Sequence, residues 1–578
     1  MHVPIGRYWT LLVTYLRPQW GTFALLVVLL LSGIGLQLLI PQITRQFLDA
    51  ATGSNDPLLG LAAGFIGLAF IQQVTTLATT YYGEQVAWRA TNALRSDLTQ
   101  HILRLDLHFH NNRSVGELIE RADTDVTQLA EFFSRLVVLV VGNLLLIGGI
   151  LLLLTAEDWR MGIGFLAFSV AALGTLALVR NIAIPYERAR KQAQAEMVGY
   201  LEERLVAIED IRSNGAEAVM IDGLTGKHHV LYESWRALAG RSAVLSGVNG
   251  SVMTAAYIVT FLSASALFEA QAITLGTAYL IFNYAVLLTR PFNEISSQID
   301  RFQSIGASVE RVEEILHIQP RIQDGGGANV PAGALSITAE GVSFSYDSTT
   351  VLHSINFHLE KGQVLGVLGR TGSGKTTLAR LLARLYDVNS GSIRLNDVDV
   401  RQFTQADLRQ RVTMVTQDVQ LFDANLRDNL TFFNREISDD RILHVMEILG
   451  LHDWLAARPA GLDSLIESGG RNLSAGEAQL LAFARVFLAD PGLVILDEAS
   501  ARLDPATEAR LERAVDRLLD QRTAIIIAHR LRTVQRADVI MILDEGRVVE
   551  WGQREQLAAD PHSHFYHLLQ TGLEEALA

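Results

Sequence analysis

Six long apolar stretches constrain the fold of this chain more than any other feature of its sequence. A helix needs about 20 apolar residues to cross roughly 30 Å of hydrocarbon, and we take each stretch as long enough to do so. The sequence therefore predicts a bundle of six membrane-spanning helices in the first half of the chain. The stretches lie near Phe23–Ile40, Leu59–Thr80, Leu136–Thr155, Met161–Val179, Ala243–Phe268 and Leu275–Leu288.

The arginines between these stretches predict which side of the membrane each loop faces. Two segments, between the second and third stretches and between the fourth and fifth, are long, charged and helical in pattern. The opposite loops are short and hold little more than Arg45 and Arg160. Because positive residues concentrate in cytoplasmic loops, the long loops and both termini are expected on the cytoplasmic side of a cytoplasmic (inner) membrane. Residues 1–20, with Trp9 and Trp20, predict an interfacial helix rather than a secretory signal peptide.

Composition narrows the class of protein. A chain of 578 residues is too long for one core and suggests two or three domains. Its hydrophobic content of 49% is typical of a membrane protein, and its net charge of -14 makes nucleic acid an unfavoured partner. The chain contains no cysteine, which excludes disulfides, thiolate metal sites and thiol catalysis.

A linker and a second domain follow the bundle. Helical periodicity continues to about Leu316, so the transmembrane domain is predicted to span residues 21–318. The Gly- and Pro-rich run "QDGGGANVPAGA" marks a linker at 319–334. Across 335–578, short β-branched strands alternate with helical patterns, which predicts an α/β domain with a largely parallel sheet.

The run "GRTGSGKTT" carries the clearest chemistry in the chain. It fits G-x-x-x-x-G-K-[ST] between an apolar strand and a helical pattern, the context that this motif requires. Its glycines let backbone N–H groups surround phosphates, Lys375 brings positive charge to the β- and γ-phosphate oxygens, and Thr376 offers a hydroxyl to Mg²⁺. ATP and Mg²⁺ are therefore the expected ligands. The run consists of Gly369, Arg370, Thr371, Gly372, Ser373, Gly374, Lys375, Thr376 and Thr377.

Residues at the ends of two further strands are the expected catalytic residues. "LVILDE" places Asp497 and Glu498 at the end of a buried strand, where Asp497 can hold the magnesium shell and Glu498 can polarise an attacking water. "AIIIAHR" ends another buried strand with His529, which could contact the γ-phosphate. Many strands end in acids and a lone histidine is usually structural, but the order of these motifs after the phosphate loop favours catalysis.

Taken in order, these motifs resemble those of an ABC transporter half of the exporter type, over nearly the whole chain. The resemblance implies that Tyr346 of "VSFSYD" stacks on adenine and that Gln417 of "MVTQDVQLF" joins the magnesium site to the membrane domain. It makes His529 the switch histidine, and "SARLD" resembles a D-loop ending in Asp504. "FHNNRSVGELIERADTDV" and "IEDIRSNGAEAV" resemble the family's two intracellular coupling segments. The implied fold class is an all-α six-helix transmembrane domain (type I exporter, type IV ABC fold) plus an α/β P-loop nucleotide-binding domain.

The run "LSAGE" stands where the family has LSGGQ, the signature that binds the γ-phosphate of the ATP held by the partner subunit. Ser474 and Gly476 match the family pattern, and the spacing from Ser474 to Glu477 also fits a helix capping box. Ala475 and Glu477 depart from it. Alanine forbids some glycine-only backbone geometry, and a carboxylate about 7 Å from a phosphate charge costs about 2 kcal/mol at an effective dielectric near 20. Arg502 is a further departure, in the D-loop.

The resemblance implies ATP-driven export of a hydrophobic or amphipathic substrate, either a drug-like molecule or a lipid, by alternating access. The expected partner is a second half-transporter chain. A heterodimer is favoured over a homodimer, because an intact catalytic glutamate beside an altered signature resembles one chain of a heterodimeric, multidrug-type exporter. Alternatives are a lipid flippase or importer on the same fold, or an ATP-gated channel or regulator. The intact Glu498 and His529 favour turnover over gating.

Several polar groups lie outside these motifs. Polar side chains at membrane depth tend to face the bundle interior or a cavity, and helix–helix hydrogen bonding is the favoured interpretation for each one. "HSHFYH" near the C-terminus lacks a nearby acid or cysteine and is not expected to bind metal. Asn396 and Asp397 predict a hairpin turn. The polar residues within the spans are Gln72, Gln73, Asn143, Asn249, Tyr257, Asn283 and Tyr284.

Overall fold

The computed structural model describes residues 13–53, 58–129, 140–416, 418–497, 505–527 and 534–571. The chain separates into two compact units. The first comprises Met1–Leu103 and Ser114–Ile318, and the second comprises Arg104–Arg113 and Gln319–Ala578.

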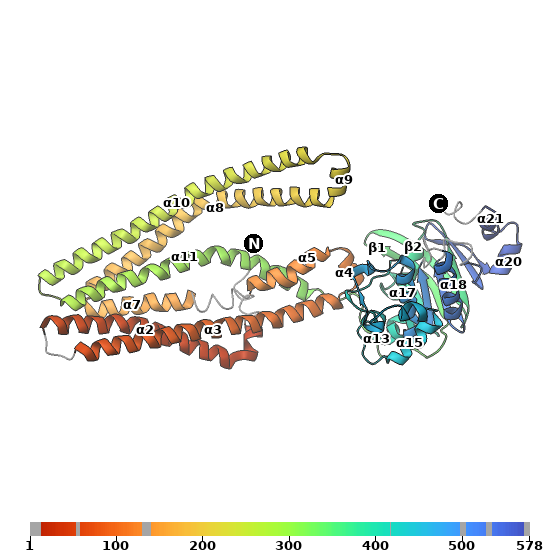
Figure 1. The fold of residues 1–578 in the computed structure, drawn as a ribbon, viewed down its shortest axis with the longest axis horizontal. Helices are drawn as coiled ribbons and strands as arrows, with labels where there is room; N and C mark the ends of the chain where they lie inside the picture. The colour runs from red at the N-terminus through yellow and green to blue at the C-terminus, as the bar shows by residue number, and fades with distance from the viewer. Residues whose placement is uncertain are drawn as a thin grey trace. The chain divides into compact units, whose positions relative to one another are not determined.

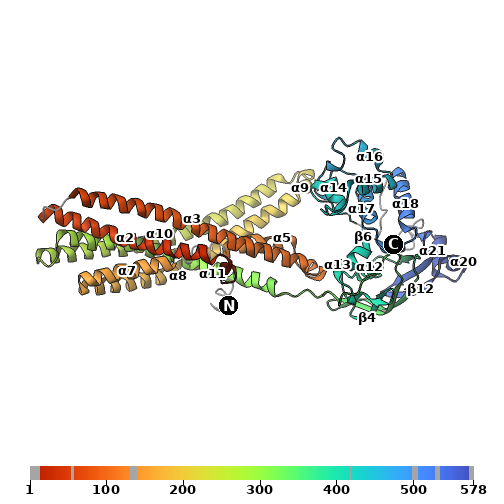
Figure 2. The same cartoon turned by 90° about the horizontal axis from the view of Figure 1, so that it is seen from below.

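The first unit is helical throughout its described residues (Figures 1 and 2). Six long helices carry the six apolar stretches within that described part. They are α2 (Trp20–Gly53), α3 (Leu58–Arg104), α7 (Gly142–Glu157), α8 (Trp159–Val206), α10 (Glu217–Glu269) and α11 (Leu275–His317). Shorter elements join them: η1 (Arg17–Gln19), α5 (Val115–Ile119), η2 (Glu120–Asp125) and α9 (Ile208–Ser213).

The helices differ in how clearly length and hydropathy mark them as membrane spans. Among the described residues, three helical segments meet both criteria: Val13–Thr52, Leu58–Arg104 and Glu217–Glu269. Two shorter apolar helical segments are Gly142–Glu157, which is α7, and Trp159–Ala172, the first part of α8. The sixth predicted span begins α11, but the helix continues well past Leu288, through Pro291. A proline inside a membrane helix is tolerated where neighbouring helices satisfy the freed backbone groups.

Packing in the first unit joins helices that are distant in sequence. Ile150, Phe165, Tyr284 and Phe292 are buried in one apolar cluster drawn from α7, α8, α10 and α11. Such interdigitated packing, rather than a hydrophobic driving force between helices, holds a bundle together in lipid.

A buried ion pair between Asp125 and Arg311 joins η2 to the C-terminal part of α11. Asp125 is fully buried and accepts hydrogen bonds from Arg311 Nε at 2.9 Å and from Ser308 Oγ at 2.9 Å. Burial acts to raise the pKa of this carboxyl, but the hydrogen bonds from Arg311, Ser308 and Arg121 outweigh it and lower the pKa below its ordinary value. The carboxylate is therefore ionised, and it anchors the segment that follows α5.

Two main sheets form the second unit. A four-stranded antiparallel sheet has the order β2–β1–β4–β5, and a six-stranded sheet has the order β12–β11–β3–β10–β9–β6. In the larger sheet every neighbouring pair is parallel except β11 and β12. The strands are β1 (Ile337–Tyr346), β2 (Thr349–Leu359), β3 (Val364–Leu368), β4 (Ser390–Leu395), β5 (Val398–Asp399), β6 (Val412–Val415), β7 (Ala424–Asn425), β8 (Leu465–Ile466), β9 (Leu493–Asp497), β10 (Thr523–Ile527), β11 (Val539–Asp544) and β12 (Arg547–Gln553).

The helices of this unit are short. They are α4 (Leu107–Asn111), α12 (Lys375–Leu382), α13 (Gln405–Arg411), α14 (Leu426–Thr431), α15 (Asp439–Ile448), α16 (His452–Ala456), α17 (Ala475–Ala489), α18 (Pro505–Leu519), α20 (Arg554–Ala559) and α21 (His564–Thr571). Three-residue 3₁₀ turns are η4 (Val400–Gln402), η5 (Gly461–Asp463) and η6 (Ser468–Gly470). The predicted Asn396–Asp397 turn is confirmed: both residues have positive φ and join β4 to β5.

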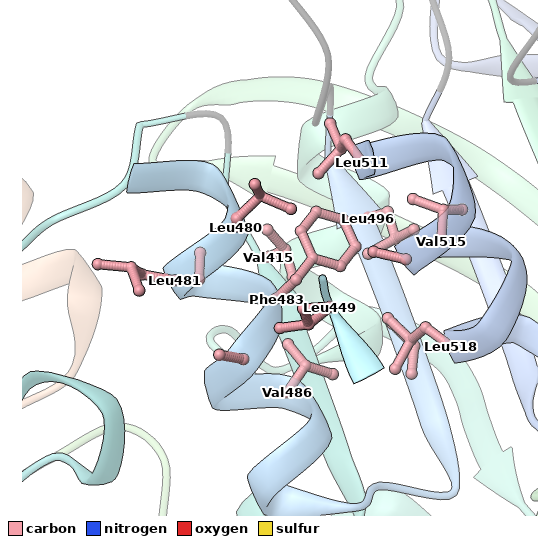
Figure 3. Packing of buried hydrophobic residues seen from close by; sticks show 14 of the residues in the cluster. Val415, Leu449, Leu480, Leu481, Phe483, Val486, Leu496, Leu511, Val515 and Leu518 are labelled. Carbon is pink, nitrogen blue, oxygen red and sulfur yellow. The ribbon is translucent and has the colours of Figure 1, made fainter. Parts of the chain in front are cut away.

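One apolar core lies between the larger sheet and helices α17 and α18 (Figure 3). Phe483 of α17 and Leu518 of α18 are fully buried there, beside Val415 of β6 and Leu496 of β9. Strands that are buried on both faces read as continuous apolar runs. This explains why "LVILD" and "TAIII" were recognisable as strands from the sequence.

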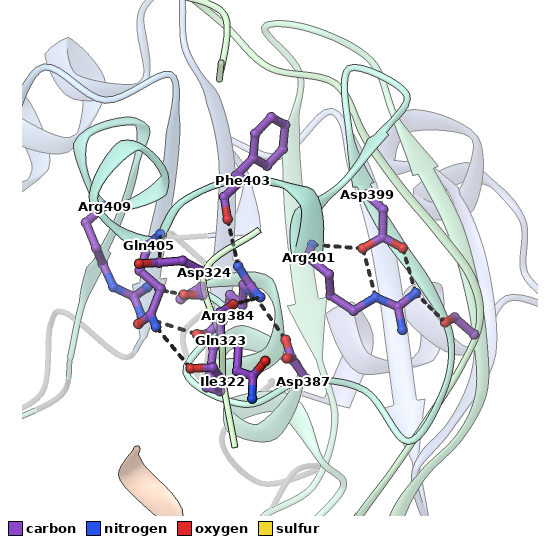
Figure 4. Close-up of polar contacts among 12 residues, drawn as sticks. Ile322, Gln323, Asp324, Arg384, Asp387, Asp399, Arg401, Phe403, Gln405 and Arg409 are labelled. Atoms are coloured by element: carbon purple, nitrogen blue, oxygen red, sulfur yellow. Dashed lines mark hydrogen bonds and ion pairs between the residues drawn. The ribbon is translucent and has the colours of Figure 1, made fainter. Parts of the chain in front are cut away.

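Arg384 fixes the Gly- and Pro-rich linker within the second unit (Figure 4). This side chain is only 2% exposed, and it donates hydrogen bonds to the carbonyl oxygens of Gln323 at 2.8 Å and Phe403 at 3.0 Å. Asp324 accepts a hydrogen bond from the backbone N–H of Gln405 at 2.8 Å. A Cβ on Gly325 would lie 2.3 Å from the backbone of Gln402, so this close approach requires glycine.

Candidate nucleotide-binding site

The loop from Gly369 to Gly374 is shaped by glycine geometry. Gly369 has φ of 150°, and a Cβ there would lie 2.1 Å from the carbonyl oxygen of Leu543. Gly374 has φ of 102°, and a Cβ there would lie 2.6 Å from Leu352. Gly372 has φ of 84° in open space, so it is required for its backbone conformation alone. A loop built in this way turns consecutive N–H groups toward one concavity, which suits an anion.

Carbonyl oxygens of the phosphate loop position the Lys375 side chain. Lys375 is the first residue of α12 and only 6% exposed, and its Nζ donates to the carbonyl oxygens of Gly369 at 2.6 Å and Arg370 at 2.9 Å. These bonds keep a buried ammonium at the N-terminus of a helix, where both the charge and the helix dipole attract phosphate.

Hydroxyl side chains flank Lys375 in the sequence. The buried Ser373 Oγ has no hydrogen-bond partner among the described residues, whereas Thr376 and Thr371 are exposed. Thr377 is buried in α12. An orphaned buried hydroxyl beside exposed ones leaves donors for phosphate oxygens and an oxygen ligand for a hard cation.

Tyr346 ends β1 within a group of aromatic rings. Its ring centroid lies 5.3 Å from that of Tyr386 and 4.9 Å from that of Phe344, both edge to face. Its hydroxyl accepts a long hydrogen bond, 3.4 Å, from Arg380 of α12. The tyrosine is therefore fixed to the helix that begins with Lys375, and its half-buried face leaves a surface on which a base can stack.

Strand register brings the remaining predicted positions to one edge of the larger sheet. Ile527 pairs with Val367 on one side and with Asp497 on the other, and Leu496 pairs with Val415. The four parallel strands β3, β10, β9 and β6 thus end together, and a polar side chain at Asp497, 6% exposed, sits at that edge. Ligands bind outside the carboxyl ends of such strands.

The three predicted catalytic residues follow these strand ends. Gln417, Glu498 and His529 lie outside the residues that the structure describes, as do Arg502 and Asp504 of the D-loop. Their roles stay predictions, supported by the strands that precede them.

The signature helix α17 begins with the predicted capping box. Ser474 Oγ accepts a hydrogen bond from the N–H of Glu477 at 3.2 Å, and the Glu477 carboxylate accepts one from the N–H of Ser474 at 2.7 Å. Ala475 is not among the residues with positive φ, so the alanine does not strain the helix start. Gly476 is buried within the first turn.

Trp454 adds a contact that the sequence did not reveal. Trp454 lies on α16, and its indole Nε1 donates to the second carboxylate oxygen of Glu477. The guanidinium of Arg458 lies over the indole ring, 4.0 Å from its centroid. Burial acts to raise the pKa of Glu477, but the bonds from Ser474 and Trp454 and the charge of Arg458 lower it below its ordinary value. A fixed negative charge therefore occupies the N-terminus of α17.

The start of the first coupling segment, α4, belongs to the second unit and packs within it. Asn111 Nδ2 donates to the Tyr386 hydroxyl at 2.8 Å, and Leu107 packs against an apolar core formed by strands of both sheets. Asp106 accepts a hydrogen bond from the N–H of Arg321 at 2.7 Å. Because Tyr386 also contacts Tyr346, the segment reaches the aromatic group of the nucleotide site through one side chain.

A polar cavity lies in the first unit among α2, α3, α7 and α11. Its volume is about 460 Å³, and three of the predicted polar residues, Gln72, Gln73 and Asn143, line it. Asn143 donates to Glu294 at 2.8 Å, and Glu294 pairs with Arg290 at 2.7 Å. This charged pair was not predicted, because the sixth apolar stretch ends at Leu288. The signal was present, since the two charges stand four residues apart on either side of Pro291.

Other polar residues of the spans bond from helix to helix or within one helix. The Tyr284 hydroxyl donates to the carbonyl oxygen of Leu38 at 2.9 Å, and the Tyr257 hydroxyl pairs with Thr289. Asn283 donates to Tyr279 of its own helix. The side chain of Asn249 is outside the described ones. Helix–helix hydrogen bonding is thus confirmed for Tyr284, Tyr257 and Asn143, whereas Asn283 bonds within its own helix.

A helical membrane bundle and a phosphate-loop sheet in one chain define a membrane transporter that hydrolyses ATP. The chain belongs to the ABC transporter family: a model described as the ABC transporter transmembrane region matches residues 23–292, and one described as ABC transporter matches residues 352–501. The predicted family and fold class are confirmed.

Relatives cover most of the chain. An uncharacterized ABC transporter ATP-binding protein, YknV of Bacillus subtilis, is 30% identical over 96% of this chain and 92% of its own. An ATP-dependent lipid A-core flippase of Idiomarina loihiensis is 27% identical over 97% of both chains. The structure of a bacterial Atm1-family ABC exporter with ATP bound has a TM-score of 0.78, covering 97% of this chain and 98% of that one at 22% identity, which shows the shared fold.

Proposed function

We propose that this chain is one half of an exporter that moves a hydrophobic or amphipathic molecule out of the cytoplasm across the cytoplasmic membrane. The observation that carries the proposal is the phosphate loop with its held Lys375, in the same chain as a membrane bundle that contains a polar cavity. Both termini and the ATPase unit face the cytoplasm, as the arginine-rich loops suggest.

Within this proposal, Lys375 and the loop N–H groups bind the ATP phosphates, and Tyr346 stacks on the base. Thr376, Asp497 and Gln417 supply hydroxyl, carboxylate and amide oxygens, the ligand set that suits Mg²⁺, which usually takes few protein ligands and completes its shell with phosphate and water. When bound, that ion neutralises charge on the phosphates. Glu498 orients the attacking water, and His529 contacts the γ-phosphate.

The polar cavity is the part of the bundle in which substrate recognition can be tested. Replacing Asn143 with leucine removes the bond to Glu294 and should lower substrate-stimulated ATPase activity several-fold while ATP binding is unchanged. The measurement uses proteoliposomes that contain the chain with its partner, with ATP-dependent uptake of hydrophobic dyes into inverted vesicles as the transport readout. Leu152→Ala is the control, because Leu152 is exposed on the same helix, α7, outside the cavity. Transport and stimulation that match the unchanged protein would contradict the proposal.

A lipid flippase is the second candidate. Relatives over nearly the whole chain are named as ATP-dependent lipid A-core flippases. Lipid substrates added to the same proteoliposomes distinguish the two, because a flippase moves labelled lipid between leaflets and leaves the hydrophobic dyes where they are.

We further propose that the complex is a heterodimer. The negative charge of Glu477 occupies the start of the signature helix, where the phosphate of the partner's ATP would bind. Because this charge repels phosphate, the ATP site that uses this chain's signature is expected to hydrolyse slowly. The other ATP site combines this chain's phosphate loop with the partner's signature. The second coupling segment, near Asn214–Ala218, is then expected to contact the partner's ATPase unit.

The heterodimer proposal predicts that the signature of this chain tolerates change. Ala475→Gly combined with Glu477→Gln should leave the main ATP turnover of the complex nearly unaltered, because the competent site uses the partner's signature. Steady-state ATPase activity and a count of retained nucleotides per complex measure this. Expression of the chain alone is the complementary test: a stable, fully active homodimer with two equivalent hydrolysing sites would exclude the idea.

A further inference from the structure

A second cavity of the first unit lies between α8 and α10, separate from the polar one. Its volume is about 570 Å³. Its walls are mainly apolar, with Phe165 and Phe168 on α8 and Val252 and Val259 on α10. Small side chains such as Ala256 leave room along its length. No residue of this cavity takes part in the ATP site or in the polar cavity.

The cavity has the length of a lipid chain. On α8 it extends from Arg160 to Thr175, which at 1.5 Å per residue is roughly 22 Å. One leaflet of the hydrocarbon core is about half of 30 Å thick. An extended acyl chain that enters at one end can therefore lie along the whole leaflet within this cavity.

A cationic group stands at one end of the cavity. Arg160 lies in the first turn of α8, and its guanidinium is 5.8 Å from the ring of Trp159, which is 61% exposed. Tryptophan and arginine together are typical of the headgroup level of a membrane. Asp158 is engaged in capping α8 through the N–H of Arg160 at 2.7 Å, and no ion pair to the Arg160 guanidinium is found among the described residues.

We propose that this cavity binds an anionic phospholipid, with its phosphate at Arg160 and one acyl chain lying between α8 and α10. A partner subunit is the other occupant that an apolar cavity could have. The lipid is favoured because the single charged residue of the lining stands at one end, at headgroup level, and the remaining lining is apolar or carries hydroxyls. This lipid is a bound component of the transporter and not its cargo.

The test is lipid retention by the full chain with its partner, purified in detergent and measured by native mass spectrometry with phosphatidylglycerol or phosphatidylcholine. The unchanged protein should retain phosphatidylglycerol in preference, and Arg160→Gln should reduce that preference about fivefold, the effect of one cation near an anionic headgroup. Arg160→Lys should restore it. Neither ATP nor transport is involved, so the result is independent of the proposed function.

Filling the cavity is the second arm. Ala256→Trp should abolish retention of both lipids, whereas Ile163→Trp, on the same helix α8 as Arg160 but 56% exposed and outside the lining, should not. Equal retention of the two lipids by the unchanged protein would overturn the proposal. A second pair of results would also overturn it: the unchanged protein binds no lipid, and Ala256→Trp no longer forms the dimer. That pair would assign the cavity to the partner subunit.

Discussion

Glu498→Gln is expected to bind Mg-ATP normally and to hydrolyse it at this chain's site roughly 10²- to 10⁴-fold more slowly, the usual contribution of a positioned general base. Glutamine keeps the shape of the side chain but cannot accept the proton of the attacking water. Glu498 directly follows Asp497, at the edge where four parallel strands end beside the phosphate loop. ATPase activity and nucleotide trapping in the purified complex measure the two effects separately.

Asp520→Asn is the matched control for charge removal in the same unit, since Asp520 is exposed between α18 and β10. It should hydrolyse ATP at the unchanged rate. A Glu498→Gln complex as active as the unchanged one would show that Glu498 has another role.

Replacing Lys375 is expected to act on binding itself. Lys375→Ala removes the ammonium that donates to the carbonyl oxygens of Gly369 and Arg370 and that we expect to bind the ATP phosphates. A charge-assisted hydrogen bond is worth about 1.5 to 3 kcal/mol, which corresponds to roughly 10- to 150-fold in ATP affinity. Equilibrium binding of a fluorescent ATP analogue measures the loss.

The chain offers a close control, because it has only four lysines, at 191, 227, 361 and 375. Lys361→Ala changes an exposed turn of the same unit and should leave affinity unaltered. Lys375→Met keeps most of the side-chain volume and separates charge from packing. If both Lys375 variants bind ATP as tightly as the unchanged protein, the loop does not hold phosphate as assigned.

Local patterns predicted the parts of the molecule that local physics determines. The phosphate loop was recognisable because the backbone conformation and close contacts at positions such as Gly369 and Gly374 each require glycine. The capping box was recognisable because Ser474 and Glu477 stand three residues apart. The spans were recognisable by hydropathy, but their helix ends were not. An apolar run marks hydrocarbon depth, whereas α11 continues through the charged residues after Leu288 and ends only at His317.

Contacts between distant residues could not be predicted in the same way. Trp454 reaches Glu477 from a separate helix 23 residues earlier, and Asn111 reaches Tyr386 across 275 residues. Nothing in the neighbouring sequence of either residue marks its partner. Nothing in the sequence around Arg384 marks it as buried, because the carbonyl oxygens of Gln323 and Phe403, which with Asp387 stabilise its guanidinium at 2% exposure, are distant in sequence.

The hydrogen bond from Arg384 to Gln323 determines where the ATPase domain should begin when it is produced as a separate protein. A boundary at Leu335, which the change from linker to strand suggests, would leave Arg384 without the carbonyl oxygen of Gln323 and Gln405 without the carboxylate of Asp324. The stretch from Gln319 onward is part of the folded unit, despite its glycines. An expression boundary for this domain belongs before Gln319, where the unit itself begins.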